Sequence, residues 1–293
     1  MNAYNQEMEI LLRQLQSKSS YTRERVSRYH EILRTGNEIF SIDLLTSHDE
    51  QKLKQTFEFL SGFFEQGMDD YEHMIDEWIF DLDIAYHALG DGSGNVVGAA
   101  NSSLLHLESG CENAESVLAV WYVAIDPKYR GRRLPNELYQ SIYQFSLERI
   151  QTERKELKAI VGEASHKEIK TIERVLSRDE IARKRVYYQD NDEVLREVPY
   201  VSPPLRWDFE TGEPAEEAQA NHLMLRLLNG EQHMPAKDLL TIIKAIYHDS
   251  YLPRQDDFLN NESYMKAGVT VDNYLRSIEA ALAEAKNGEI FLK

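Results

Sequence analysis

The chain contains 293 residues, and its 50 Asp and Glu residues against 33 Lys and Arg residues give a formal net charge of −17 at pH 7. This acidic balance argues against general binding to nucleic acid, whose phosphates repel a negative protein. With 42% hydrophobic residues, the chain can bury a full core in one large domain or in two modest ones. No stretch approaches the ~18 consecutive apolar residues that a membrane-spanning helix needs, so we expect no membrane partner.

Two further features concern the cellular compartment and metal ions. The N-terminal sequence MNAYNQEMEI lacks the basic and then apolar layout of a signal peptide, and the single cysteine, Cys111, excludes an intrachain disulfide. Both features are typical of a cytoplasmic protein. The histidines show no paired metal-ligand spacing, and the acidic stretch from Asp69 to Asp83 lacks the glycine and spacing of a calcium loop. We therefore expect no metal site.

The first 36 residues are expected to form a helical extension. Apolar residues recur at helical spacing over residues 4–34, with a candidate break at Lys18, and Gly36 is a favourable stop signal. We interpret this segment as a packing extension or as a dimer element, which makes a homodimer a candidate assembly.

The next stretch alternates between strand and helix signals. Polar residues around Ser47 cap an amphipathic helix, and the turn Gly-Asp-Gly-Ser-Gly-Asn at residues 90–95 is a strong hairpin signal. The elements predicted here are a strand over residues 39–45, helices over 49–64 and 71–80, and strands over 84–89 and 96–107.

An apolar strand, a basic turn and a helix follow at the centre of the chain. Residues 117–125 are rich in β-branched and aromatic side chains and are bounded by polar residues, as in a buried strand. Residues 128–133 then place four cations around a single glycine, and a helix begins near Pro135. Such a turn suits a phosphate group, because the unpaired N–H groups and the dipole of a first helical turn face it and arginine adds bidentate donors.

The sequence VWYVAIDPKYRGRRLPNEL, residues 120–138, resembles the acyl-CoA-binding segment of the GCN5-related N-acetyltransferase (GNAT) superfamily. In that superfamily the amides of an Arg-Gly-x-Gly-x-Gly-like loop hold the CoA pyrophosphate, and the preceding strand pairs with the pantetheine arm. The resemblance implies acetyl-CoA as the co-substrate. The residues that it assigns to acetyl-CoA are Tyr122, Val123, Ala124 and Ile125 on the strand and Arg130, Gly131, Arg132, Arg133 and Leu134 in the loop.

The loop departs from the superfamily pattern at two positions. Arg133 and Pro135 stand where the two later glycines belong. Glycine permits close backbone approach to a ligand, whereas proline has no N–H to donate. The site would then be weaker, lean on arginine side chains or be lost, and the alternative interpretation is an ordinary solvated turn.

The remainder of the chain continues the mixed pattern. The predicted elements are a strand over residues 157–162, helices over 166–176 and 178–188, strands over 194–201 and 222–228 around a polar link over 207–220, and helices over 235–247 and 271–285. The order implies an α/β (α+β) fold with a GNAT-like mixed, mostly antiparallel central sheet flanked by helices. The expected regions are a helical extension over 1–36, the acyltransferase domain over 37–232 and a second helical extension over 233–293.

Glu163 is the candidate general base. It follows a short apolar strand, and a carboxylate held at a strand end in a partly apolar cleft can have a raised pKa and accept a proton from an amine. The alternative is a surface glutamate that caps the next helix.

Tyr188 is the candidate acid, because the resemblance implies a thiolate-protonating tyrosine near this position. A phenol remains neutral at working pH and can donate to sulfur. Asp190-Asn191-Asp192 replaces the Gly-Phe that usually follows, and Tyr187 is the neighbouring alternative. Aromatic residues at such positions are also common in cores.

The distribution of charge suggests the acceptor. No Lys or Arg occurs from Gln55 to Pro127, whereas fourteen Asp and Glu residues do. A cleft of one charge sign concentrates ligands of the opposite sign, so we expect a cationic small-molecule amine or lysine acceptor; a solvated acidic face is the alternative. Together these features predict an acyl-CoA-dependent N-acetyltransferase that works by direct transfer, with a catalytically silent GNAT-like binding or regulatory module as the alternative.

Overall fold

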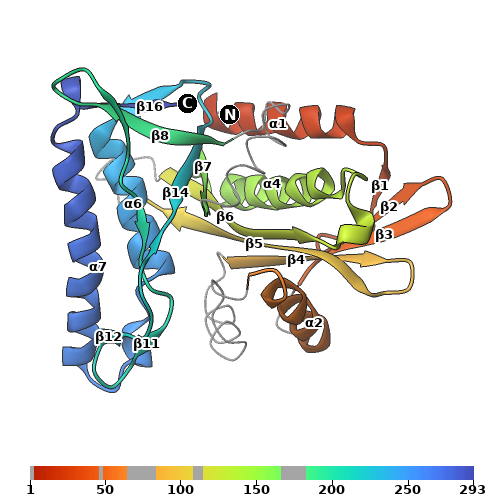
Figure 1. Cartoon of the computed structure of the whole chain (residues 1–293). Helices are drawn as coiled ribbons and strands as arrows, with labels where there is room; N and C mark the ends of the chain where they lie inside the picture. Colours follow the sequence, from red (N-terminus) through yellow and green to blue (C-terminus); the bar gives the residue numbers. More distant parts are fainter. Residues whose placement is uncertain (1–2, 46–48, 65–83, 108–114, 166–182) are drawn as a thin grey trace. The chain divides into compact units, whose positions relative to one another are not determined.

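The structure of the chain is a computed structural model that describes residues 3–45, 49–64, 84–107, 115–165 and 183–293. Contacts divide the chain into two compact units, residues 1–104 with 118–157 and residues 105–117 with 158–293. Each unit is an antiparallel sheet accompanied by helices (Figure 1). The predicted fold class, a mixed α/β protein with a mostly antiparallel sheet flanked by helices, is confirmed.

The sheet of the first unit is built from strands that follow one another in the chain. Neighbouring strands run in the order β1 to β6, and the pairs from β1–β2 to β4–β5 are antiparallel. The predicted hairpin between the fourth and fifth strands is confirmed, with Gly94 at φ +82°, where an L side chain would be strained. The strands are β1 (Thr22–Arg25), β2 (His30–Thr35), β3 (Glu38–Leu44), β4 (Ile84–Asp91), β5 (Val96–His106) and β6 (Glu115–Ile125).

The prediction of helix over residues 4–34 is correct only at its start. The helix α1 (Ala3–Lys18) ends at the expected break, and residues 22–35 form the β1–β2 hairpin instead. Val26 and Tyr29, two of the apolar residues of the predicted helix, lie in this hairpin and are 56% and 47% exposed. The hairpin forms in place of a helix because β2 pairs with β3 and Leu33 is then completely buried. The spacing of apolar residues along the sequence does not reveal this long-range interaction.

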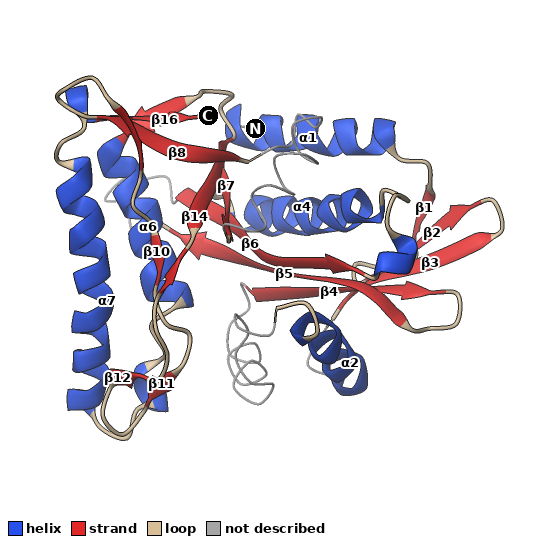
Figure 2. Cartoon of the chain, in the orientation of Figure 1, coloured by secondary structure: helices blue, strands red, loops and turns tan. Residues whose placement is uncertain are grey.

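Two helices cover the two faces of this sheet (Figure 2). On one face, α2 (Glu50–Ser61) packs Leu53 and Leu60 against the small side chains of β4 and β5. On the other, α4 (Leu134–Glu153) packs Leu134 and Leu138 against Leu33. The helix α1 in turn packs on α4. The predicted starts of α2 and α4 agree with the structure, and the helix predicted over 71–80 lies outside the described residues.

The second unit has a sheet whose strands come from distant parts of the chain. Its order is β7–β14–β8–β16–β15, with β9 beside β8, and all of these pairs are antiparallel. The helix α6 (Ala236–Ser250) packs on β15, β16 and α7 (Asn261–Leu282). The strands are β7 (Glu156–Ala164), β8 (Lys184–Gln189), β9 (Leu195–Glu197), β14 (His222–Leu227), β15 (His233–Pro235) and β16 (Glu289–Leu292).

Three predictions need correction in this unit. The helix expected over 178–188 is wrong for its described part, because β8 alternates buried Val186 and Tyr188 with partly exposed neighbours and pairs on both sides. The predicted strand over 194–201 is two short strands, β9 and β10 (Val201–Ser202). The polar link holds the short strands β11 (Trp207–Asp208), β12 (Glu213–Pro214) and β13 (Gln219–Ala220).

The C-terminal region contains more than helices. The helix α7 begins ten residues earlier than predicted, because the Asn260 side chain accepts a hydrogen bond from the Ser263 amide at 2.9 Å and caps it there. The last strand, β16, completes the sheet by pairing with β8. The helix predicted over 166–176 lies outside the described residues. The region boundaries near residues 36 and 232 stay predictions. No helix in the described part of the chain is long and apolar enough to cross a membrane.

Candidate functional site

The loop between β6 and α4 has a backbone shaped for an anion. A short 3-10 helix, Pro127–Tyr129, follows β6, and α4 begins at Leu134. Gly131 (φ +81°) and Arg133 (φ 58°, ψ 15°) are left-handed, whereas Arg132 between them is not. Alternation of this kind turns successive N–H groups toward one side and makes a concave anion site, called a nest.

The amides of this loop are available for a ligand. None of the described residues offers a hydrogen-bond acceptor to the N–H groups of Gly131, Arg132, Arg133 or Leu134. Pro135 has no N–H, and the Asn136 amide donates to the Arg133 carbonyl at 2.9 Å. Four consecutive unpaired donors therefore precede the first turn of α4, where the helix dipole also favours a negative group.

Two tyrosines hold the loop in this conformation. The Tyr21 hydroxyl donates to the Arg132 carbonyl at 3.1 Å, and the Tyr129 hydroxyl donates to the Asp91 carboxylate at 3.2 Å. The rings of both tyrosines meet Phe40 edge to face. These contacts restrict the loop, and a restricted loop loses less entropy when it binds a ligand.

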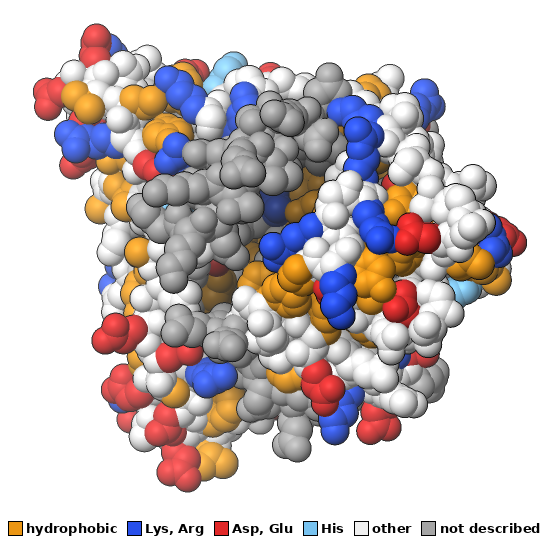
Figure 3. All heavy atoms as spheres, turned by 45° about the vertical axis from the view of Figure 1, so that its right-hand side comes forward, with side chains coloured by type: hydrophobic (Ala, Val, Ile, Leu, Met, Phe, Trp, Pro, Cys, Tyr) orange, Lys and Arg blue, Asp and Glu red, His pale blue; other side chains and the backbone are white. Residues whose placement is uncertain are grey.

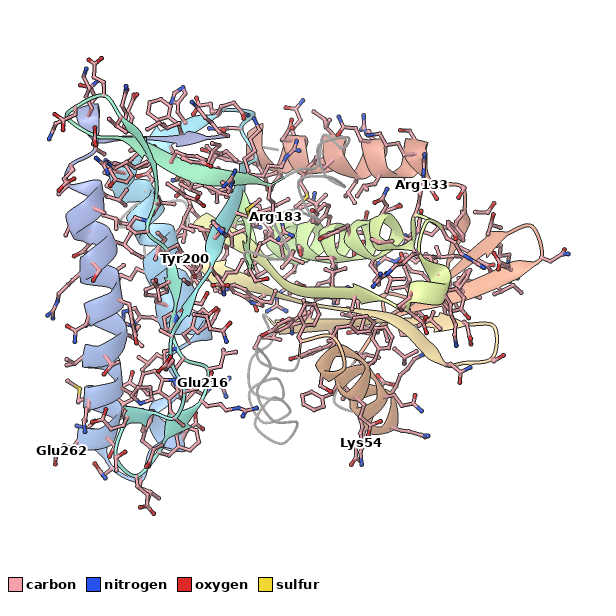
Figure 4. All side chains as sticks on the ribbon, viewed as in Figure 1. Lys54, Arg133, Arg183, Tyr200, Glu216 and Glu262 are labelled. Carbon is pink, nitrogen blue, oxygen red and sulfur yellow. The ribbon has the colours of Figure 1, made fainter. Side chains whose placement is uncertain are left out.

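The three arginines of the loop differ in their availability. Arg132 forms an ion pair with Glu38 and lies over the Tyr129 ring at 5.2 Å. Arg133, near the junction of α1 and α4 (Figure 4), donates to the Lys18 carbonyl at 2.7 Å, at the C-terminus of α1. Arg130 is exposed, and its guanidinium has no partner among the described residues. Figure 3, which brings this side of the first unit forward, shows Lys and Arg side chains beside apolar ones.

The strand residues predicted to contact the co-substrate lie directly before this loop. Tyr122 packs its ring on Phe64, with the centroids 5.0 Å apart. Ala124 belongs to the apolar cluster that contains α2, whereas Val123 and Ile125 pack in the cluster that contains α4. Because most of these side chains serve the core, only backbone groups of the strand could serve a pantetheine arm.

Glu163 lies in the second unit at the centre of a hydroxyl network. It is on β7 opposite Leu223 of β14. Its carboxylate accepts hydrogen bonds from the hydroxyls of Tyr200 and Ser202, and from that of Tyr251 at 2.6 Å. Asn221 supports the network by donating to the Ser202 hydroxyl at 2.8 Å. The structure therefore describes a partly buried carboxylate that three hydroxyls orient, and not a solvated surface glutamate.

Burial controls the proton affinity of this network. Burial raises the pKa of Glu163 above its usual range, while hydrogen bonds from Ser202, Tyr200 and Tyr251 oppose that rise. Burial, and next the Glu163 charge, raises the pKa of the Tyr200 phenol well above 10, so this group stays protonated and donating. Three donors fit an ionised carboxylate, which only accepts hydrogen bonds. Burial thus favours the neutral form of Glu163, whereas its three hydroxyl partners favour the ionised form.

The sequence reasoning found Glu163 but missed its partners. Tyr200, which is 3% exposed (Figure 4), and Ser202 flank Val201 in the segment around β10, and Tyr251 ends α6. The one available signal was the spacing of Tyr247 and Tyr251 on one face of an apolar helix. The Tyr247 hydroxyl bonds to the Val201 carbonyl and so fixes the segment that carries the other two donors.

Tyr188 is not brought together with this network. Its side chain is 5% exposed on β8, opposite Ile290 of β16 and Arg196 of β9. Burial and then the Glu284 charge raise its pKa. In the described ranges its hydroxyl has no hydrogen-bond partner, and no contact joins it to Glu163. The role of Tyr188 as the thiolate acid stays a prediction.

Two further predictions meet the limits of the described chain. Where the structure describes the chain, no group of three or more His, Cys, Asp or Glu side chains is placed to hold a metal ion. Most of the acidic stretch expected to face the acceptor, residues 65–83, lies outside the described residues, as does Cys111.

Comparison with known proteins gives similarity of structure alone. No protein-family model matches the sequence, and no curated protein matches it. The chain aligns with the aminoglycoside acetyltransferase meta-AAC0020 from an uncultured soil metagenomic sample, in complex with sisomicin, at 17% identity and a TM-score of 0.40 over 50% of this chain and 91% of that one. NAA60 of Arabidopsis thaliana in complex with acetyl-CoA aligns at 12% identity and a TM-score of 0.43, over 65% of this chain and 99% of that one.

A third similar structure is the aminoglycoside N-acetyltransferase AAC(6')-Iy with a CoA-containing bisubstrate analogue, at 15% identity and a TM-score of 0.37 over 49% of this chain and 93% of that one. The names of the two aminoglycoside enzymes identify them as acetyltransferases. At these identities the likeness concerns the path of the chain, and the ligands named belong to those proteins.

Proposed function

We propose that the protein is an acyl-CoA-dependent N-acyltransferase that moves an acetyl group from acetyl-CoA to an amine by direct transfer. The observation that carries this proposal is the row of four unpaired amides at residues 131–134, between a β-strand and the start of α4. A CoA pyrophosphate has several closely spaced anionic oxygens, and a nest at a helix N-terminus offers it closely spaced donors.

The residues of the first unit suit such a ligand. The amides of Gly131 to Leu134 would hold the pyrophosphate, and the Arg130 guanidinium, which has no partner among the described residues, would add a charge-assisted contact. Backbone groups of Tyr122 to Ile125 would hold the pantetheine arm. Acetyl-CoA supplies the activated thioester, and the protein supplies its orientation toward the amine.

Glu163 would serve as the general base. An amine that is cationic in water must lose a proton before its nitrogen can attack a carbonyl. A carboxylate with a raised pKa, held in one orientation by three hydroxyls, can accept that proton directly or through water. Tyr188 would give its phenol proton to the departing CoA sulfur. The second proton that the nitrogen loses after attack would restore the phenol through solvent, and Glu163 would release its proton to solvent, which closes the proton balance.

The acceptor would be a cationic small-molecule amine or a lysine side chain. The support is the excess of 50 acidic over 33 basic residues, and the absence of any Lys or Arg from residue 55 to residue 127. One-signed charge raises the local concentration of cations, and salt weakens this effect.

The test is titration calorimetry with acetyl-CoA followed by a turnover screen. The full-length protein should bind acetyl-CoA, and it should acetylate amines in preference to alcohols, with rates that fall as salt rises. Absence of acetyl-CoA binding would refute the proposal. Preference for anionic or neutral acceptors, or rates indifferent to salt, would refute the acceptor class alone.

A silent binding module is the second candidate, and one observation favours it. The positions occupied by Arg133 and Pro135 give the loop a strained residue and a missing donor. A module of this kind would bind acetyl-CoA without turnover of any amine in the screen. The two candidates therefore separate in a single pair of experiments.

A further inference from the structure

The β1 strand places an arginine against a buried carboxylate in the first turn of α4. Glu137 is 1% exposed, and one of its carboxylate oxygens, Oε1, has no hydrogen-bond partner among the described residues. The Arg23 guanidinium donates to the other oxygen, Oε2, at 3.0 Å and to the Glu137 carbonyl at 2.9 Å. Arg23 also pairs with Glu31 on β2.

The position of Glu137 matters for an anion. It lies three residues after Leu134, within the helical turn that follows the four unpaired amides. A carboxylate at a helix N-terminus is attracted by the same dipole and amides that an incoming phosphate would use. An uncompensated carboxylate there would repel the phosphate, and burial would leave little water to screen it.

We propose that Arg23 is a positioning residue for anion binding, because it neutralises Glu137 and so leaves the positive end of α4 available to a diphosphate. This inference rests on the proposed function, since the diphosphate is that of acetyl-CoA. It also assigns a task to the N-terminal segment: the β1–β2 hairpin prepares the electrostatics of the loop, while Tyr21 just before it holds the Arg132 carbonyl.

The chain provides a matched control on the same strand. Arg25 of β1 pairs with Glu148, which lies eleven residues further along α4. At 1.5 Å per residue the two carboxylates are about 16 Å apart along the helix, which exceeds the ~8–10 Å Debye length at physiological salt. Both pairs join β1 to α4, but only the Arg23 pair lies next to the loop.

The experiment measures binding of inorganic pyrophosphate and of acetyl-CoA by calorimetry in four full-length proteins: wild type, Arg23→Met, Glu137→Gln and Arg25→Met. Arg23→Met should lower the affinity for both ligands by about three- to thirty-fold, the range expected for a charge at a helix terminus. Arg25→Met should bind both as the wild type does. Glu137→Gln should bind both more tightly, because Arg23 then has only Glu31 to neutralise.

The Glu137→Gln variant separates electrostatics from folding. A purely structural role for the pair predicts weaker or unchanged binding in this variant, whereas the proposal predicts tighter binding. Removing one partner of a buried pair is destabilising, so the single Arg23→Met protein could fail to fold. The double variant Arg23→Met/Glu137→Gln, which removes both partners, is then measured in its place. This double variant should bind within about two-fold of wild type.

Several results would overturn the inference. They are wild-type affinity in a folded Arg23→Met protein, no gain in Glu137→Gln, or weak binding that persists in the double variant. If the wild-type protein binds neither ligand, the proposed function fails with the inference. If the wild type binds and the Arg23 and Glu137 variants match it, the inference fails alone.

Discussion

A buried histidine makes a specific prediction about how the free energy of unfolding depends on pH. His87 of β4 is completely buried, and neither of its ring nitrogens has a hydrogen-bond partner among the described residues. The His87 ring meets the ring of Phe145 of α4 edge to face, with the centroids 6.1 Å apart. Burial lowers the pKa of His87 from 6.5 to about 3, because the interior does not solvate the imidazolium.

The sign of the effect on stability follows from proton linkage. Well above pH 6.5 the imidazole is neutral in both the folded and the unfolded chain, so His87 adds no pH dependence there. Between pH 6.5 and about 3 the unfolded chain binds a proton that the folded chain does not. The free energy of unfolding therefore falls as the pH falls, by about 2 kcal/mol at pH 5, which is 1.5 pH units below the ordinary pKa at about 1.4 kcal/mol per unit.

The perturbation is His87→Leu, which keeps a side chain of similar size without polar atoms. At pH 7 the variant should be more stable by about 1–3 kcal/mol, because two unpaired buried nitrogens are removed. At pH 5 the gap between variant and wild type should widen by about 2 kcal/mol. Urea unfolding of the variant and the wild type at pH 7 and at pH 5 measures both differences in the free energy of unfolding. Carboxylates also titrate in this pH range, but they contribute equally in the two proteins, so their contribution cancels in the difference.

An exposed histidine provides the control. His233→Leu also removes one imidazole, but at an exposed position, and should leave the pH dependence of unfolding as in the wild type. A gap that stays constant from pH 7 to pH 5 would refute the reasoning, as would an NMR titration in which the His87 imidazole of the folded protein protonates near pH 6.5.

The other predictions concern the candidate site. Arg130→Ala should weaken acetyl-CoA binding by about 1.5–3 kcal/mol in calorimetry, and unchanged affinity with an intact fold would remove this side chain from the site. Tyr188→Phe should lower kcat with little change in acetyl-CoA affinity; if Tyr187→Phe does so instead, the assignment is one residue off. Tyr251→Phe removes a hydrogen bond that favours the ionised form of Glu163, so the pKa of Glu163 should rise further and the acid limb of the pH–rate profile should move to higher pH; an unmoved limb would contradict this role of the carboxylate.

The sequence predicts the elements whose signals are local. The strand at residues 117–125, the basic turn and the helix after it are each marked within about ten residues, and the structure has them there. The β1 strand, Thr-Arg-Glu-Arg, has no such signal, because it is charged. Its arginines find their partners at Glu31, Glu137 and Glu148, and the last two are more than one hundred residues away. Long-range pairing of this kind is invisible to periodicity.

The candidate site likewise has one residue that local sequence predicts and several that it does not. Glu163 could be found because a polar residue ends an apolar strand. The hydroxyls that bind it belong to residues 37, 39 and 88 positions later, and apart from the spacing of Tyr247 and Tyr251 nothing in their own surroundings marks them as partners of a carboxylate. The direction of its pKa shift could be anticipated from burial, but the opposing hydrogen bonds could not.

The two departures of the loop from the superfamily pattern can be examined in the backbone of the loop. Glycine is favoured where φ is positive, yet Arg133 adopts a left-handed φ of 58°. This conformation costs a non-glycine residue about 1–2 kcal/mol. The guanidinium of the same residue donates to the exposed carbonyl end of α1 at Lys18, a charge-assisted hydrogen bond that offsets the cost. Pro135 removes one donor, but the four amides before it remain unpaired. The substitutions change how the loop is held, through the N-terminal segment, and leave its row of donors intact.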